Sequence, residues 1–278
     1  MISVIVCSAD DRKFAQVKAE YGRVLHGTPH ELVGVHDARS LCEGYTEGMR
    51  RAHGDVFVFS HDDVGFAMAP EAFRDSLRAA LDHADVIGVA GASRLIGPSW
   101  SQAGQPFLHG QVIHFHPEDR LYMVGIYGTG AGLTPDVCAL DGVFIAARRE
   151  VAERVGFDAA SFGGFHFYDL DFTFRAWRAG LRIAVANEID LVHFTRAQSY
   201  DASWHEYTAV FMRKHGAVLH APPIRQGPQG PMADYLTVYT REFDKALELV
   251  RRSRSDAAFF AQISAMARAV PAGVGFMV

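Results

Sequence analysis

The amino-acid sequence predicts an α/β protein with a mixed, mainly parallel β-sheet flanked by helices. Apolar runs typical of buried strands occupy residues 2–7, 31–35 and 56–60. Two segments with apolar residues at helical spacing, about 11–25 and 40–52, lie between these runs. Strands and helices that alternate in this way fold into a parallel sheet with right-handed crossover connections.

Local signals support the first two helices. Asp10 or Asp11 can cap the first helix, after the turn that follows the first strand. Ser40 is placed to cap the second helix, and Glu43 three residues later completes a capping box. Gly54 then ends this helix just before the third strand. The chain is therefore expected to begin with a β-α-β-α-β unit.

The rest of the chain alternates less regularly. Further helices are expected at about residues 70–81, 148–155, 169–179 and 203–215, the last of them capped by Ser203. Further strands are expected at residues 85–90, 111–116, 121–127, 137–147, 182–186 and 190–194. Residues 91–110 contain several Gly and Pro and no periodicity, so they are expected to form a long loop.

A change of composition near the C-terminus predicts the domain boundaries. Residues 1–220 are expected to form the main domain, and the Pro- and Gly-rich residues 221–231 a linker. Residues 232–278 are expected to form a helical appendage, with an amphipathic helix over 232–252 and an Ala- and Phe-rich helix over 256–269. The second of these helices is expected to pack either on the main domain or on a second subunit, so the C-terminal helices are also the expected contact surface of a homodimer.

Composition excludes several classes of protein. The 278 residues are 49% hydrophobic and 21% charged, which is ordinary for a globular chain and excludes overall disorder. The formal net charge of −5 argues against a general nucleic-acid-binding surface. Three Cys without a CxxC pair, no signal peptide and no long apolar stretch favour a cytoplasmic protein without a transmembrane segment. A P-loop motif, GxxxxGKS or GxxxxGKT, is absent from the sequence.

The third strand ends in the polar sequence His61-Asp62-Asp63. Polar residues at the carboxyl end of a buried strand lie at the edge of the sheet where α/β proteins bind ligands. Carboxylate oxygens suit Mg²⁺ or Mn²⁺, and an imidazole nitrogen shifts the preference toward Mn²⁺. A polar turn in which an Asp caps the next helix is the alternative interpretation.

Several features together resemble the GT-A fold glycosyltransferases, specifically the family-2-like group of nucleotide-sugar-dependent enzymes. Beyond the β-α-β-α-β start and its acidic tip, the matching segments are Asp141-Gly142, Gly156-Phe157-Asp158, Tyr168-Asp169, Arg178-Ala179-Gly180 and His193. The segments Ala38-Arg39-Ser40 and His61-Asp62-Asp63-Val64 look like a bacterial subgroup, in which the usual Asp-x-Asp motif is written His-x-Asp-Val. The resemblance covers about residues 1–216.

The resemblance implies a divalent cation, Mn²⁺ or Mg²⁺, held by Asp63 together with His61 and His193. A His that is buried and hydrogen-bonded for structural reasons is the alternative for His193. The implied donor is a UDP- or GDP-sugar. Its expected contacts lie in the loops after the first three strands, at Ser8, Ala9, Asp37, Arg39 and Asp62.

The resemblance also assigns a general base. Asp169 matches the residue that deprotonates the acceptor hydroxyl, which leads to inversion at the anomeric carbon. An Asp at the start of a helix can instead serve as its N-cap, which is the alternative role for Asp169.

The expected sugar or acceptor contacts are Asp141, Gly142, Asp171 and Trp100. For Asp141-Gly142 a plain β-bulge is the alternative interpretation. The His residues near Trp100 in the sequence, at positions 109, 114 and 116, either line the same site or form one polar face of a hairpin.

The implied reaction is the metal-dependent transfer of a sugar to a saccharide or glycolipid acceptor, without a nucleic-acid partner. His61 and Tyr168 depart from the family pattern, which has Asp and Glu at these two positions. Because of these departures, a non-catalytic module that binds a glycan or a nucleotide on the same fold is the alternative. Turnover in the presence of metal distinguishes the enzyme from the binding module.

Overall fold

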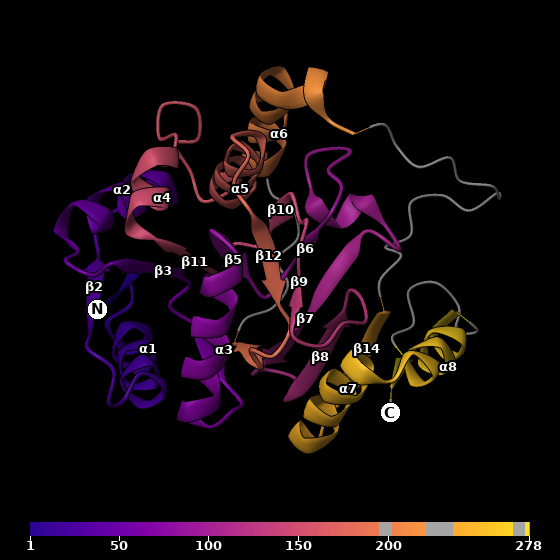
Figure 1. Ribbon diagram of the computed structural model, residues 1–278. Helices are drawn as coiled ribbons and strands as arrows, with labels where there is room; N and C mark the ends of the chain where they lie inside the picture. The colour runs from indigo at the N-terminus through magenta and orange to yellow at the C-terminus, as the bar shows by residue number, and fades with distance from the viewer. Residues whose placement is uncertain (195–201, 221–235, 269–275, 278) are drawn as a thin grey trace.

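The computed structural model describes residues 1–194, 202–220, 236–268 and 276–277 of the protein. These residues form two mixed β-sheets covered by helices (Figure 1). The described strands of the first sheet, in spatial order, are β2 (His30–Val35), β1 (Ile2–Cys7), β3 (Val56–Ser60), β11 (Phe144–Arg148), β5 (Val86–Gly88), β12 (Ile183–Ala186) and β9 (Leu133–Thr134). The first sheet contains the predicted β-α-β-α-β unit.

The first sheet is mixed, as the sequence predicts. Strand β1 pairs in parallel with β2 and β3, and β12 pairs in parallel with β5. Strand β11 runs antiparallel to both of its neighbours, and β9 runs antiparallel to β12. The parallel pairs therefore form only part of the sheet, because β11 returns from a later part of the chain and inserts between β3 and β5.

The second sheet was not predicted from the sequence. Its described strands are β10 (Ala139–Leu140), β6 (Ala90–Ala92), β7 (Leu108–His116), β8 (Leu121–Ile126), β14 (Leu236–Thr240) and β15 (Phe276–Met277), with β13 (Leu191–His193) beside β7 and β4 (Val64–Phe66) beside β13. Most of its pairs are antiparallel, including the predicted β7–β8 hairpin. This sheet lies next to the carboxyl ends of β1 and β3.

Helices cover both faces of the first sheet. In Figure 1, α1 (Asp11–Val24) and α3 (Pro70–His83) lie on one side, and α2 (Leu41–Arg51), α4 (Arg149–Val155) and α5 (Tyr168–Arg178) lie on the other. Helix α6 (Ala202–His215) packs on α5. Helices α7 (Phe243–Ser255) and α8 (Ala257–Arg268) lie along the second sheet. The described residues also include two 3₁₀ turns, η1 (Trp100–Ala103) and η2 (Gly216–Val218). Among the described residues, no helix is both long and apolar enough to cross a membrane.

Two predicted caps are confirmed and one is wrong. The Asp10 carboxylate accepts hydrogen bonds from the backbone N–H groups of Arg12 and Lys13 at the start of α1. The Ser40 hydroxyl accepts one from Glu43 at the start of α2. Ser203 does not cap α6, because this helix already begins at Ala202.

Two predicted strands are each split between the sheets. The apolar run 85–90 is divided into β5 of the first sheet and β6 of the second. The run 137–147 is divided into β10 of the second sheet and β11 of the first, and the chain passes between them at Asp141-Gly142. The β-bulge alternative for this dipeptide is therefore wrong. The crossing from β3 to β4, through His61, Asp62 and Asp63, is of the same kind.

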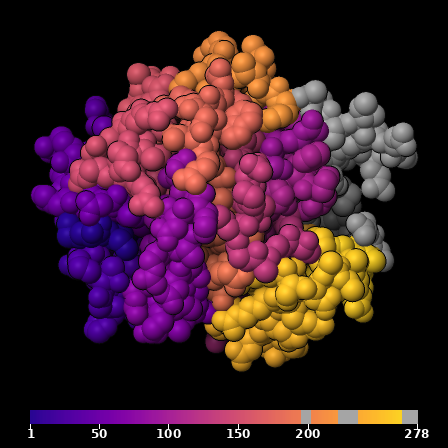
Figure 2. Space-filling view, viewed as in Figure 1, coloured from indigo at the N-terminus to yellow at the C-terminus, as the bar shows by residue number. Residues whose placement is uncertain are grey.

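The C-terminal segment is not wholly helical. The predicted helix over 232–252 is wrong in its first part, because β14 precedes α7 and pairs antiparallel with β8. Figure 2 shows α7 and α8, in yellow, against the magenta surface of the β7–β8 region. A second hydrophobic core forms between these elements, from Ile113, Val124, Ile126, Val192, Leu236, Val238, Ala246, Leu249, Val250 and Ile263. The predicted linker 221–231 lies outside the described residues, and the division into a main domain and an appendage stays a prediction.

Candidate active site

The segments that pass between the sheets meet at a cleft of about 980 Å³. Its wall includes residues from the carboxyl ends of β1 and β2, the crossings at 61–63 and 141–142, and the start of α5. Side chains from distant parts of the sequence converge here because each crossing leaves the first sheet at the same edge. Ten of the thirteen predicted site residues line this cleft directly: Ser8, Ala9, His61, Asp62, Asp63, Trp100, Asp141, Gly142, Asp169 and His193.

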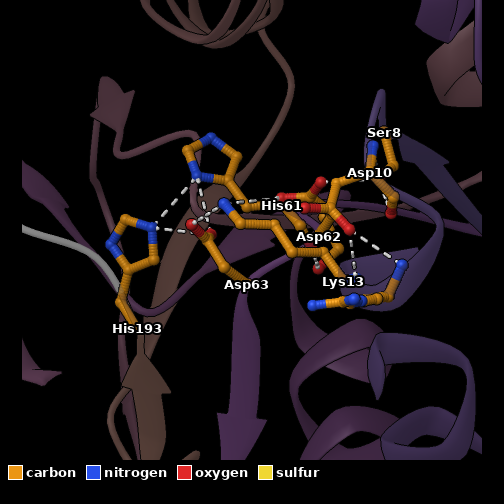
Figure 3. Close-up of polar contacts among 9 residues, drawn as sticks. Ser8, Asp10, Lys13, His61, Asp62, Asp63 and His193 are labelled. Atoms are coloured by element: carbon orange, nitrogen blue, oxygen red, sulfur yellow. Dashed lines mark hydrogen bonds and ion pairs between the residues drawn. The ribbon is translucent and has the colours of Figure 1, made fainter. Parts of the chain in front are cut away.

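The three predicted metal ligands form a compact cluster (Figure 3). His193 Nε2 lies 3.0 Å from Asp63 Oδ1, and the His61 Nδ1 atom lies 3.3 Å from His193 Nε2. His61 Nδ1 lies 4.0 Å from the same Asp63 oxygen. The pairing of β4 with β13 produces this proximity, because it sets His193 opposite Val64, the neighbour of Asp63.

The donor set of this cluster fits a divalent transition metal. Two donors at right angles around an ion with bonds of about 2.1 Å are separated by about 3 Å, close to two of the three separations observed, 3.0 and 3.3 Å, whereas the third is 4.0 Å. Two imidazole nitrogens with one carboxylate oxygen favour Mn²⁺ and similar ions over Mg²⁺, which prefers oxygen ligands. The Nε2 atom of His193 points into the cluster, and its Nδ1 atom is buried without a hydrogen-bond partner. Both the ligand role of His193 and the alternative of a buried, hydrogen-bonded histidine are compatible with these contacts.

The charges around the cluster favour an ionised Asp63 and a neutral His61. Burial opposes ionisation of Asp63, but His193, His61 and Lys13 together outweigh burial and lower the pKa of its carboxyl. Burial and the neighbouring His193 lower the pKa of His61. The Asp63 carboxylate and the His61 ring are therefore in the protonation states that a cation requires.

Lys13 is a site residue that the sequence did not reveal. Its Nζ donates to Asp63 Oδ2 at 3.1 Å and lies 3.8 Å from Asp62 Oδ1 (Figure 3). Asp62 also accepts a hydrogen bond of 2.6 Å from the Ser8 hydroxyl. A lysine in the first turn of a helix, where the helix dipole disfavours a cation, is the sequence signal that can identify such a residue. Lys13 therefore places a positive charge beside the carboxylates of the cleft.

Asp169 lies in the cleft but does not cap α5. The cap position belongs to Phe167, whose φ of 66° is in the left-handed region that bulky residues rarely adopt. Asp169 is therefore in the first turn of α5, and its carboxylate accepts backbone hydrogen bonds from Gly142 and from this turn. Burial, and then the charge of Asp141, raise the pKa of Asp169 to about 7. A carboxylate with such a pKa is suited to accept a proton near neutral pH.

Asp141 and Trp100 form one wall of the cleft. The Trp100 indole N–H donates to Asp141 Oδ2 at 3.2 Å, and the Val143 N–H donates to Oδ1 at 2.9 Å. The Trp100 ring packs edge-on against Tyr127, with centroids 4.7 Å apart. His114 also lines the cleft, whereas His109 bonds to Ser93 outside the cleft wall.

Three predicted site residues do not line the cleft. Asp171 was predicted as an acceptor contact, which is wrong, because its side chain is 1% exposed and pairs with Arg175, Lys214 and His215. These contacts join α5 to α6. Asp37 and Arg39 are beside the cleft wall, and the Arg39 guanidinium pairs with Glu43 on the exposed surface of α2. Their role as donor contacts stays a prediction.

Comparisons with known proteins identify the family. A search of curated proteins finds no significant match. Among solved structures, the mannosyltransferase PcManGT from Pyrobaculum calidifontis, in complex with GDP-Man and Mn²⁺, is 15% identical, with 99% of this chain and 75% of that chain covered and a TM-score of 0.47. TarS 1-349 from S. aureus, in complex with UDP-GlcNAc, is 12% identical, with coverages of 79% and 68% and a TM-score of 0.47. The model of the glycosyltransferase like family matches residues 3–215. Because this match spans most of the chain, the protein belongs to the glycosyltransferase-like family and is a glycosyltransferase.

Proposed function

We propose that this enzyme transfers a sugar from a UDP- or GDP-sugar to a hydroxyl group of a saccharide or glycolipid acceptor, with inversion at the anomeric carbon. One observation carries the proposal. A single cleft holds a three-donor cation site and, separately, a carboxylate whose pKa is raised to about 7. Transfer from a nucleotide sugar needs both parts, one to hold the diphosphate and one to take the acceptor proton.

The donor side of the cleft is the part near β1 and β2. Ser8 and Ala9 directly follow the first strand, and the apolar side chains of Val35 and Leu41 lie on the wall of the same cleft. This combination suits a nucleoside, whose base needs apolar contact and whose ribose needs polar groups. Lys13, in the same part of the wall, is placed to face the negative charge of a diphosphate.

His61, Asp63 and His193 are the residues that would hold the divalent cation. A cation bound there neutralises charge that develops on the leaving diphosphate. Asp63 is already ionised at neutral pH, because its pKa is lowered, so it loses no proton when it binds the cation.

Asp169 is the proposed base for the acceptor. The proton of the acceptor hydroxyl passes to the Asp169 carboxylate while the hydroxyl oxygen bonds to the anomeric carbon. The bond between this carbon and the diphosphate oxygen breaks in the same step, and its electron pair leaves with the nucleoside diphosphate. Attack from the face opposite the leaving group inverts the configuration. A general base of this kind contributes roughly 10²–10⁴-fold to the rate.

The test has a binding part and a turnover part. UDP, GDP and their common sugars are screened by thermal shift, each with and without Mn²⁺. A ligand at 100 times its Kd stabilises a protein by about 2.7 kcal/mol, which raises the Tm of a chain of this size by several degrees. We expect one nucleotide to raise the Tm in the presence of Mn²⁺. Release of nucleoside diphosphate is then measured with that donor and a panel of saccharide and lipid-linked acceptors.

Three variants complete the test. Asp63→Ala is expected to abolish the Mn²⁺-dependent shift, whereas Asp55→Ala, an exposed carboxylate at the opposite end of β3, is expected to keep it. Asp169→Asn is expected to keep the shift and to lose turnover by at least about 10²-fold. A wild-type protein that binds no nucleotide with Mn²⁺, or an Asp169→Asn variant with full turnover, would overturn the proposal.

A further inference from the structure

The two residues at which the chain departs from its family pattern are in direct contact. His61 follows β3 and Tyr168 begins α5, so 107 positions separate them in the sequence. In the structure the His61 Nε2 atom lies 2.8 Å from the Tyr168 hydroxyl oxygen, which is a hydrogen-bond distance. The opposite nitrogen of the same ring, Nδ1, faces the His-Asp-His cluster. Tyr168 thus contacts the side of His61 that points away from the cation site.

The partners of His61 determine which ring nitrogen carries its proton. His193 Nε2 is 3.0 Å from an Asp63 carboxylate oxygen, which can only accept, so this nitrogen carries a hydrogen. His61 Nδ1, 3.3 Å from the same N–H, then has to be an acceptor. The proton of the neutral His61 ring is consequently on Nε2, where it is donated to the Tyr168 oxygen. This tautomer directs the Nδ1 lone pair at the place where the cation would bind.

The hydroxyl of Tyr168 is held firmly in this position. The side chain is 4% exposed, and its ring packs beside Tyr45 with centroids 5.5 Å apart. Gly142 leaves the space that the hydroxyl occupies, because a Cβ at this position would lie 2.0 Å from the Tyr168 oxygen. The glycine at the sheet crossing is therefore needed for the tyrosine, in addition to any contact with a sugar.

We propose that Tyr168 is a positioning residue for the cation site. Its hydroxyl oxygen accepts the Nε2–H of His61, so that His61 presents its Nδ1 atom to the cation as a ligand. This inference rests on the proposed function, because it assumes that the cluster binds a divalent cation. It also explains why the two departures occur together. A metal-binding histidine generally donates its outer N–H, the one that faces away from the metal, to an acceptor. An Asp at position 61 has no N–H and therefore needs no such acceptor.

The first test measures Mn²⁺ affinity without any turnover, from the electron paramagnetic resonance signal of free Mn²⁺. Tyr168→Phe removes only the hydroxyl and is expected to weaken Mn²⁺ binding by roughly 10- to 100-fold, the usual effect of losing such a partner. Tyr45→Phe is the matched control, since Tyr45 is equally buried in the same cluster of rings but donates to the Ser60 carbonyl. This variant is expected to keep the wild-type affinity.

A double-mutant cycle separates positioning from a general structural role. In a His61→Asp background the outer N–H is absent, so Tyr168→Phe is expected to cause no further loss of Mn²⁺ affinity. A loss of the same size in both backgrounds would show that the hydroxyl acts through the fold and would overturn the inference.

A second measurement needs no variant at position 168. In ¹⁵N-histidine spectra of the metal-free wild-type protein, with His61→Gln used for assignment, His61 is expected as the Nε2–H tautomer. An Nδ1–H tautomer, or equal Mn²⁺ affinity in Tyr168→Phe and wild type, would overturn this inference and leave the proposed function intact. A wild-type protein without Mn²⁺ affinity would overturn the cation site and this inference with it.

Discussion

Asp141 and Asp169 bring two carboxylates into one cleft, and their contacts give them different tasks. Both oxygens of Asp141 accept hydrogen bonds, from the Val143 N–H and from the Trp100 indole. Asp169 borders the cleft, and burial together with the Asp141 charge raises its pKa to about 7. Asp141 thus raises the pKa of the proposed base, Asp169, without having to touch the acceptor itself.

This arrangement predicts the pH dependence of turnover. A base has to be deprotonated to act, so kcat/KM is expected to rise with pH and to level off above about 7. Asp141→Asn keeps one of the two accepting oxygens and removes the charge that raises the Asp169 pKa. The rising limb is then expected to move to lower pH, by roughly one unit. A limb that stays in place in Asp141→Asn would contradict the assignment of Asp169 as the base.

The Lys13 ammonium and a bound cation are expected to compete for the Asp63 carboxylate. This ammonium pairs with Asp63, one of the three proposed ligands. The Lys13 side chain is 44% exposed, and such pairs contribute roughly 0.2–1 kcal/mol. Lys13→Met is therefore expected to bind Mn²⁺ up to about fivefold more tightly when no nucleotide is present. The same variant is expected to bind the nucleoside diphosphate more weakly, since the cleft loses a positive charge; isothermal titration measures both, and tighter nucleotide binding would contradict the role given to Lys13.

At the level of elements, α7 is fixed to the second sheet by a buried group of charges. Asp190, just before β13, is 4% exposed and pairs with Arg251 and Arg254 of α7. Arg254 also donates to the Gln111 side chain of β7 at 3.2 Å. The charge pairs therefore join α7, β7 and the segment that carries His193.

Asp190→Ala is expected to lower the free energy of unfolding by about 3–5 kcal/mol, because it removes the nearest carboxylate from the buried Arg254, which keeps only Gln111 and the more distant Glu188. The exposed pair of Glu71 and Arg74 provides a control, and Glu71→Ala is expected to cost less than about 1 kcal/mol. Urea unfolding measures both values. Similar, small losses in the two variants would show that the Asp190 pair does not anchor α7.

The sequence predicts those elements whose signals are local. The β-α-β-α-β unit, the caps at Asp10 and Ser40 and the polar tip after β3 are all visible in short windows, and the structure contains them. The change of sheet at Val89 leaves no such signal, since the residues on both sides of it are apolar and fully buried. Asp171 was misassigned for a related reason. Its spacing from Asp169 indicates a different face of the helix, but nothing in a local window shows that Lys214 and His215 lie opposite it.

At the scale of the whole molecule, the C-terminal segment and the first 220 residues share a hydrophobic core. Ile113, Val124 and Ile126 of the β7–β8 hairpin pack against side chains of β14 and α7 in that core. The pairing of β14 with β8 covers an edge that would otherwise be open among the described strands. The helices that were predicted as a dimer surface thus use apolar residues within their own chain, and a homodimer stays a prediction.

Truncation tests whether residues 1–220 form an independent domain. A chain that ends at residue 220 loses β14 and the helices over the second core, so we expect it to aggregate or to melt at a markedly lower temperature. Differential scanning calorimetry and light scattering measure these outcomes. A monomeric fragment with the Tm of the full chain would support the domain boundary that the sequence predicts.

The most direct test of the central claim is a crystal structure of the protein with Mn²⁺ and the nucleoside diphosphate selected by the thermal-shift screen. We predict one anomalous Mn²⁺ peak within bonding distance of His61, Asp63 and His193, with the diphosphate on the same ion and the nucleoside near Ser8. The acceptor side, next to Asp169, should remain open. A Mn²⁺ ion bound by other residues, or a nucleotide bound outside this cleft, would contradict the account.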